Sequence, residues 1–209
     1  MGLPIDFWFD FSCPYAYLAA TQRHALARDA QSIVTPQPFL LGGVFRALDQ
    51  AQNLSTTLSP PKARHNRLDV IRWASWFEVP LATPFKHPNR SVDALRALLA
   101  TPPEHWDAVI DAFYRLYWVE SRDISNLHEL RSALLALNLD ADSILRLAQS
   151  DAIKDDLHQR TQLALEVGVF GAPAFVVNGQ LFWGQDRLPF VVRAAQGWLP
   201  EQGRTSFTF

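Results

Sequence analysis

The chain contains one cysteine, Cys13, and its neighbours place the thiol where reactive sulfurs recur in proteins. An apolar run typical of a buried strand, residues 5–10, comes just before it, and a helix-like stretch, residues 15–29, comes just after it. Free backbone N–H groups at the start of a helix stabilise a thiolate, so this position predicts a lowered thiol pKa. Pro14 suits a first helical turn. The alternative is that Cys13 is a small buried hydrophobic residue.

The composition is that of a globular protein, because 48% of the 209 residues are hydrophobic and 19% are charged. A net charge of −2 provides no basic surface for nucleic acid. No apolar run approaches the roughly 18 residues of a membrane span, and the N-terminus does not have the shape of a signal peptide. One cysteine excludes an internal disulfide, and the histidines lack the spacing of metal ligands. We therefore expect a cytoplasmic protein with no metal, no nucleic-acid partner and no membrane partner.

The two ends of the chain have α/β patterns. Asn178-Gly179, between two apolar runs, is a strong signal for a two-residue β-hairpin. Asp186 is a candidate N-cap for the closing helix, and residues 40–43 are predicted to be a glycine-rich turn. The predicted strands are residues 5–10, 33–39, 174–177 and 181–183, and the predicted helices of these two parts are residues 15–29 and 187–198.

The middle of the chain has helical periodicity and no convincing strand. The predicted helices there are residues 62–77, 92–100, 103–117, 126–137, 143–148 and 151–166. We therefore predict an α/β fold with a large all-helical insertion, residues 45–165, between the β-α-β and β-β-α halves of a thioredoxin-like domain. That domain comprises residues 1–44 and 166–201, and residues 202–209 are predicted to be a tail. Such a domain carries a thiol at its first strand-to-helix turn, often faced by a cis proline, for which Pro173 is the candidate.

Several segments of the chain resemble the 2-hydroxychromene-2-carboxylate isomerases, which are relatives of the kappa-class glutathione transferases and of the DsbA-like thiol oxidoreductases. The matching segments are residues 6–18, 40–47, 62–74, 88–91 with 94–96, and 168–175 with 182–188. The resemblance implies a glutathione-dependent enzyme. In this family the position of Cys13 is usually a serine, whose hydroxyl holds the glutathione sulfur as a thiolate.

The resemblance also implies a glutathione site made by two further segments. The backbone of Ala172, just before Pro173, pairs with the cysteinyl part of the tripeptide in this family. A four-residue turn holds the γ-glutamyl end, with Asp186 suited to pair with its ammonium group. The residues of this turn are Trp183, Gly184, Gln185 and Asp186.

A second, aromatic substrate is expected to lie against the helical insertion. Lys62 and Asn89 fall on family positions with the same residue types, and Arg46 falls near a basic position, so each is a candidate to hold a carboxylate. The family often has a tyrosine three residues after the lysine, where this chain has His65. Relatives of this kind are often homodimers.

The resulting hypothesis is a glutathione-dependent cis–trans isomerase of an aromatic-degradation intermediate of the 2-hydroxychromene-2-carboxylate type. Cys13 leaves other functions open. A mixed disulfide between Cys13 and glutathione would make the chain a monothiol oxidoreductase, since Ala16 stands where a second cysteine would be needed for a dithiol cycle. The pattern also leaves open a kappa-like glutathione transferase and a non-enzymatic glutathione-binding protein.

Overall fold

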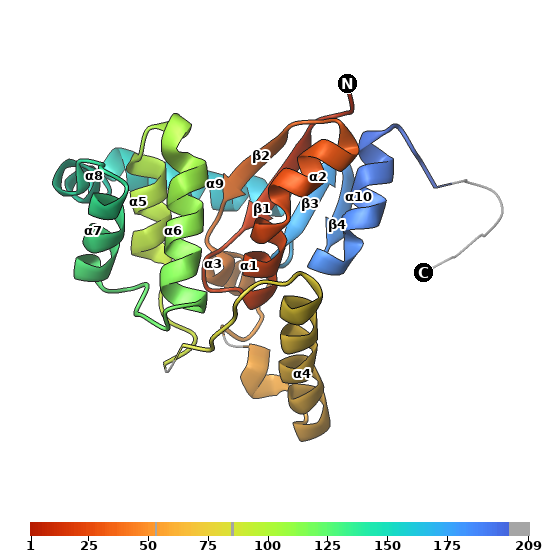
Figure 1. Cartoon of the computed structure of the whole chain (residues 1–209), viewed down its shortest axis with the longest axis horizontal. Helices are drawn as coiled ribbons and strands as arrows, with labels where there is room; N and C mark the ends of the chain where they lie inside the picture. Colours follow the sequence, from red (N-terminus) through yellow and green to blue (C-terminus); the bar gives the residue numbers. More distant parts are fainter. Residues whose placement is uncertain (53, 85, 201–209) are drawn as a thin grey trace.

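The protein is built around a four-stranded sheet, shown in Figure 1, a computed structural model that describes residues 1–52, 54–84 and 86–200. The strands are β1 (Ile5–Phe9), β2 (Val34–Pro38), β3 (Ala174–Val177) and β4 (Gln180–Trp183). Their order is β2-β1-β3-β4, with β1 parallel to β2 and antiparallel to β3, and β3 antiparallel to β4. The sheet is thus a thioredoxin-like α/β core, as the sequence predicted.

Helices from both ends of the chain cover the sheet. They are α1 (Pro14–Thr21), α2 (Arg23–Ala30), α3 (Leu41–Ala47), α9 (Asp151–Glu166) and α10 (Leu188–Ala195). Helix α2 packs on β2 and α10, whereas α9 packs on β2 and α3. Strand β1 is a central strand, and its apolar residues on both faces of the sheet are almost completely buried, which explains its continuous apolar pattern.

The remaining helices gather on one side of the sheet, except for α4 (Pro60–Trp76), which projects from the body (Figure 1). The gathered helices are α5 (Val92–Ala100), α6 (Trp106–Trp118), α7 (Leu127–Ala136) and α8 (Ala141–Leu147), and the short 3-10 turns of the chain are η1 (Leu54–Thr57), η2 (Pro103–His105) and η3 (Gln185–Arg187). Helix α6 packs on α1, α5 and α7, and so joins this bundle to the thiol turn. Among the described residues, no helix is both long and apolar enough to cross a membrane.

Two local predictions were wrong. The helix expected at residues 15–29 is two helices, with a break where the buried Arg23 guanidinium donates to the Ala20 carbonyl at 2.9 Å. The turn expected at residues 40–43 is the start of α3, because the Leu41 N–H is fixed by the Asp10 carboxylate at 2.9 Å. The predicted domain boundaries stay a prediction, and the predicted tail at 202–209 lies outside the described residues.

Candidate active site

Cys13 is the N-cap residue of α1, at the turn that follows β1. Its backbone is extended, with φ −95° and ψ 120°, and its N–H donates to the Asp10 carbonyl at 3.1 Å. Pro14 occupies the first helical turn, as the sequence predicted. The thiol therefore lies at the N-terminal end of a helix that begins one residue later.

The cis-proline loop faces the thiol. The Ala172–Pro173 peptide bond is cis, which confirms Pro173 as the cis proline expected before the third strand. The Cys13 Sγ donates to the Ala172 carbonyl oxygen at 3.1 Å, although the two residues are 159 positions apart in the chain. This hydrogen bond joins the two halves of the thioredoxin-like core at the thiol.

The expected lowering of the Cys13 pKa was wrong. Burial raises the pKa of the thiol to about 12, since only 9% of the residue is exposed. The backbone N–H groups of Ala16 and Tyr15 lower it, and the negative charge of Asp10 raises it further, so the desolvation of the thiolate outweighs the helix N-terminus. The structure thus favours a neutral S–H group, the form needed to donate to Ala172.

Asp10 is a buried acidic residue that the sequence analysis missed. Its Oδ1 accepts hydrogen bonds from the Ser12 N–H and Ser12 hydroxyl, both at 2.8 Å, and its Oδ2 accepts from the Leu41 N–H at 2.9 Å. The carboxylate thereby ties the thiol turn to the start of α3. A signal was present, because Asp10 is an acidic residue at the end of a strand whose apolar run continues into Phe11.

The Trp183 ring lies on the cis-proline loop. It packs against Phe170 with ring centroids 5.1 Å apart, and 52% of its surface is exposed. A Cβ atom at Gly171 would come within 2.7 Å of the Trp183 Nε1, so a larger residue at this position would displace the ring. Trp183 thus offers an exposed aromatic surface beside the backbone of Ala172.

The rest of the predicted glutathione turn lies in η3 and just before it. Gly184 has φ +114°, a conformation that glycine adopts readily, and its N–H donates to the Pro173 carbonyl at 3.0 Å. Gln185 is buried, whereas Asp186 is 38% exposed and lies 3.4 Å from Arg187. Helix α1 packs against η3. The structure therefore places the turn beside the cis-proline loop and the thiol helix.

Asp186 is not the N-cap of α10, contrary to the sequence prediction. The N-cap residue is Arg187, and it makes no capping hydrogen bond through its side chain. The reason is that η3 occupies the turn before α10, so that Asp186 belongs to a separate short element. Its carboxylate therefore does not cap α10, and it lies 3.4 Å from the Arg187 guanidinium.

The three predicted substrate residues lie on separate segments. Lys62 is exposed on the first turns of α4, and Arg46 is exposed on the last turn of α3. Asn89 is half-buried, with its side-chain amide donating to Asp123 at 2.5 Å and its backbone N–H donating to the Tyr117 hydroxyl at 2.9 Å. These contacts fix Asn89 in place, and its role toward a substrate stays a prediction.

Tyr15 is a second residue of the site that the sequence analysis missed. Its hydroxyl donates to the Asp69 Oδ2 of α4 at 3.2 Å. Burial raises its pKa, and so do the negative charges of Asp69, of a Cys13 thiolate and of Asp186. The phenol therefore lies among the thiol turn, α4 and η3. No local pattern pairs residues that are 54 positions apart, so the sequence held no clear signal for this contact.

Among the described residues, no three histidine, cysteine, aspartate or glutamate side chains gather as metal ligands would. The carboxylate that acts on the thiol is that of Asp10, whereas those of Asp69 and Asp186 act on the Tyr15 phenol. The predicted cations Arg46 and Lys62 lie on α3 and α4.

Comparison with known proteins gives one consistent result over nearly the whole chain. The family model of the DSBA-like thioredoxin domain matches residues 4–196. A 2-hydroxychromene-2-carboxylate isomerase of Sphingobium xenophagum is 33% identical over 193 residues, which cover 91% of this chain and 97% of the relative. Glutathione S-transferase kappa 2 of Caenorhabditis elegans is 25% identical over 206 residues, with 90% of this chain and 89% of the relative covered.

The fold agrees with the sequence match. A solved structure of a 2-hydroxychromene-2-carboxylate isomerase superimposes with a TM-score of 0.82 at 25% identity, covering 93% of this chain and 95% of that one. The similarity therefore includes the thioredoxin-like core as well as the helices between its halves. The chain belongs to the DSBA-like thioredoxin-domain family and, within it, to the enzyme family of the 2-hydroxychromene-2-carboxylate isomerases.

Proposed function

We propose that the protein is a glutathione-dependent cis–trans isomerase of an aromatic-degradation intermediate of the 2-hydroxychromene-2-carboxylate type. The observation that carries the proposal is the state of Cys13. A buried thiol with a raised pKa is a neutral hydrogen-bond donor, and it stands where the family usually has the hydroxyl of a serine. The name of the kappa-class glutathione transferase relative supports glutathione as the cofactor.

The residues around the thiol fit glutathione chemically. The exposed Asp186 carboxylate can pair with the γ-glutamyl ammonium, and the Ala172 backbone can pair with the cysteinyl part. The two glycines of this region, Gly171 and Gly184, leave room where a Cβ would meet the Trp183 ring or the Asp186 carboxylate. Bound there, glutathione would supply a thiolate whose lone pair adds to a conjugated double bond and later leaves, which permits rotation between the two events.

The protein's own groups would act mainly on that sulfur. The Cys13 S–H turns from the Ala172 carbonyl to the sulfur, which frees the carbonyl to accept a peptide N–H from the tripeptide. The backbone N–H groups of Tyr15 and Ala16, which already lower the pKa of Cys13, add positive potential at the same place. The thiolate is then held close to the substrate in a site with little water.

Opposite the glutathione site, we propose that the carboxylate of the aromatic substrate is held by Lys62, with Arg46 and Asn89 as further binding residues. Lys62 and Arg46 are exposed cations, so they keep their hydrogen-bonding capacity for a ligand. We also propose a cytoplasmic homodimer, because reduced glutathione is a cytosolic reagent and relatives of this kind are often dimers.

The raised pKa also separates this proposal from the monothiol oxidoreductase. A thiol that stays protonated is a poor nucleophile toward disulfides. A kappa-like transferase keeps the same glutathione site and differs in retaining the conjugate, so the product distinguishes it from an isomerase.

The test follows conversion of 2-hydroxychromene-2-carboxylate by absorbance, with and without glutathione, in wild type, Cys13→Ser and Cys13→Ala. We expect Cys13→Ser to keep or raise the activity, since a hydroxyl donates better than a thiol. Cys13→Ala should lose about 10- to 100-fold, the effect of one hydrogen bond to a charged group. Asp186→Ala should weaken glutathione binding by calorimetry. Activity without glutathione, or complete loss in Cys13→Ser, would contradict the proposal.

A further inference from the structure

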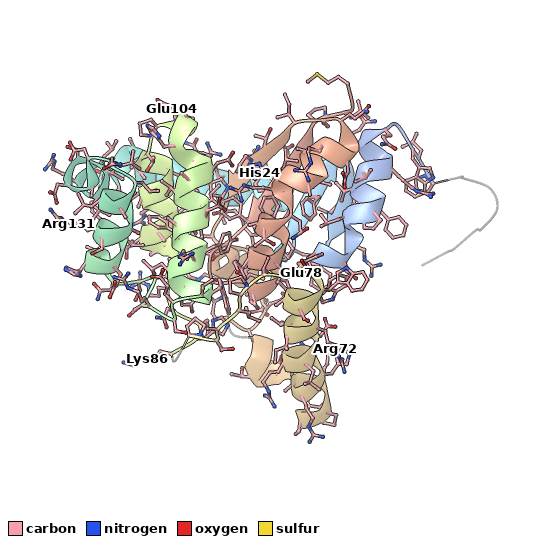
Figure 2. The ribbon with its side chains drawn as sticks, viewed as in Figure 1. His24, Arg72, Glu78, Lys86, Glu104 and Arg131 are labelled. Carbon is pink, nitrogen blue, oxygen red and sulfur yellow. The ribbon has the colours of Figure 1, made fainter. Side chains whose placement is uncertain are left out.

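Helix α4 is attached to the rest of the protein over a small part of its surface. Of its 17 residues, Ala74 is the one that is fully buried, and the side chains of Leu68, Ile71 and Trp76 are 45%, 58% and 78% exposed. Figure 1 shows the helix projecting from the body, and Figure 2 shows Arg72 extending from it into the open. Burial therefore contributes little to the position of α4.

The attachment is firmer in the second half of the helix. There Ala74 is buried and Asp69 and Trp73 are half-buried, whereas in the first half two residues are half-buried and the other seven, including Lys62, are exposed. The first half, the free end of α4, is therefore attached less firmly than the second. Because a helix rises 1.5 Å per residue, Lys62 lies about 10 Å beyond Asp69 along the axis.

Asp69 forms a hydrogen bond that reaches the thiol turn. Its Oδ2 accepts from the Tyr15 hydroxyl at 3.2 Å, and Tyr15 is two residues after Cys13. The carboxylate is the single acidic group on a helix that carries four cations. Lys62 is seven residues before Asp69, two helical turns away, so both lie on the same stripe of α4. The hydrogen bond that holds Asp69 against Tyr15 therefore also sets which way the Lys62 side of α4 faces.

We propose that Asp69 is a positioning residue that acts through the Tyr15 hydroxyl, holding α4 so that Lys62 faces the site at Cys13. The inference rests on the proposed function, because it names how the second substrate's cation is placed. Helix α1 also packs on η3, so Tyr15 connects the glutathione side of the site to the substrate side. Loss of the bond leaves the glutathione side in place and lets the free end of α4 move.

The kinetic test compares Tyr15→Phe, Asp69→Leu and Asp69→Asn with wild type. Tyr15→Phe and Asp69→Leu should raise the KM for the aromatic substrate about three- to tenfold, with a smaller change in kcat and in glutathione affinity. Asp69→Asn should keep the wild-type KM, because the asparagine amide oxygen still accepts the hydrogen bond from the Tyr15 hydroxyl. Tyr17→Phe is the matched control: it removes a neighbouring hydroxyl of α1 that donates to the Pro80 carbonyl beyond α4, and should leave KM unchanged.

A second measurement needs no enzymatic activity. Hydrogen exchange of the free protein should be faster in residues 60–70 of Tyr15→Phe and Asp69→Leu, and unchanged in α6 and in Asp69→Asn. If the exchange rates respond as expected but glutathione does not support isomerisation in wild type, the proposed function fails and the positioning role of Asp69 stands. Unchanged exchange and unchanged KM in both Tyr15→Phe and Asp69→Leu would overturn the inference while leaving the proposed function intact.

Discussion

Helices α6 and α4 both reach the thiol turn, but they are held in different ways. Helix α6 buries seven of its 13 residues, and two of its side chains hydrogen-bond the thiol turn's backbone. The Trp118 Nε1 donates to the Phe11 carbonyl at 2.8 Å, and the Tyr114 hydroxyl donates to the Asp10 carbonyl at 3.3 Å. Helix α4 has one fully buried residue and reaches the turn through Tyr15 and Asp69.

The difference assigns separate tasks to the two helices. The glutathione sulfur needs a rigid donor and fixed backbone N–H groups, and α6 holds the turn that carries them. The aromatic substrate has to enter and leave beside that sulfur, which a lightly attached helix permits. Arg23 further holds α6 in place, since its buried guanidinium joins α2 to Asp107 and Asp111 of α6 at 3.1 and 2.6 Å.

The largest expected difference is between one tryptophan of each helix. Trp118→Ala should lower the free energy of unfolding by about 3–5 kcal/mol, because it leaves a cavity and an unpaired Phe11 carbonyl. Trp76→Ala, which removes a side chain that is 78% exposed, should change it by less than about 0.5 kcal/mol. Urea unfolding measures both. Equal losses in the two variants would abolish the distinction between the helices.

A smaller effect is expected at the joint between α2 and α6. Arg23→Met keeps most of the side-chain length but removes the bonds to both carboxylates and to the Ala20 carbonyl. We expect a loss of about 2 kcal/mol, below the usual cost of breaking a buried pair, because Asp107 and Asp111 are 59% and 60% exposed and regain water. Thermal and urea unfolding measure it, and an unchanged stability would show that packing alone joins the helices.

The smallest expected effect is a loss of stability at high pH, and it concerns Cys13 in the turn that α6 holds. The pKa of Cys13 in the folded protein, about 12, is above the 8.5 of an unfolded cysteine. The buried, neutral thiol therefore stabilises the folded protein fully below about pH 8.5, and this stabilisation is lost as the pH rises toward 12. Between pH 7 and pH 10, wild type should lose about 1–2 kcal/mol more than Cys13→Ser, which has no thiol. Parallel losses in the two proteins would show that the folded thiol titrates normally.

Local patterns were enough to predict much of the fold. The apolar run before Cys13, the Asn178-Gly179 hairpin and the two helices at residues 92–100 and 151–166 are all found where the sequence predicted them. Each of these signals depends on neighbours in the chain. Pro173 was the candidate for a cis proline, because the order of elements places it opposite the thiol, and its peptide bond is cis.

The missed features depend on contacts between distant segments. The pKa of Cys13 is set by burial under other elements, and burial cannot be counted from the residues beside it. The same holds for Asp10, which stabilises the glycine-containing start of α3, and for the bond between Tyr15 and Asp69. The same holds for η3, which removes Asp186 from the N-cap of α10: it begins after Gly184, whose N–H donates to the distant Pro173 carbonyl.

The central claim is that Cys13 assists a glutathione sulfur and does not bond to it. The most direct measurement is the mass of the intact protein after incubation with oxidised glutathione at neutral pH, before and after unfolding in urea. A buried, protonated thiol predicts no glutathionyl adduct on the folded protein and a full adduct on the unfolded one. A stoichiometric mixed disulfide on the folded protein would contradict the account and favour thiol–disulfide exchange.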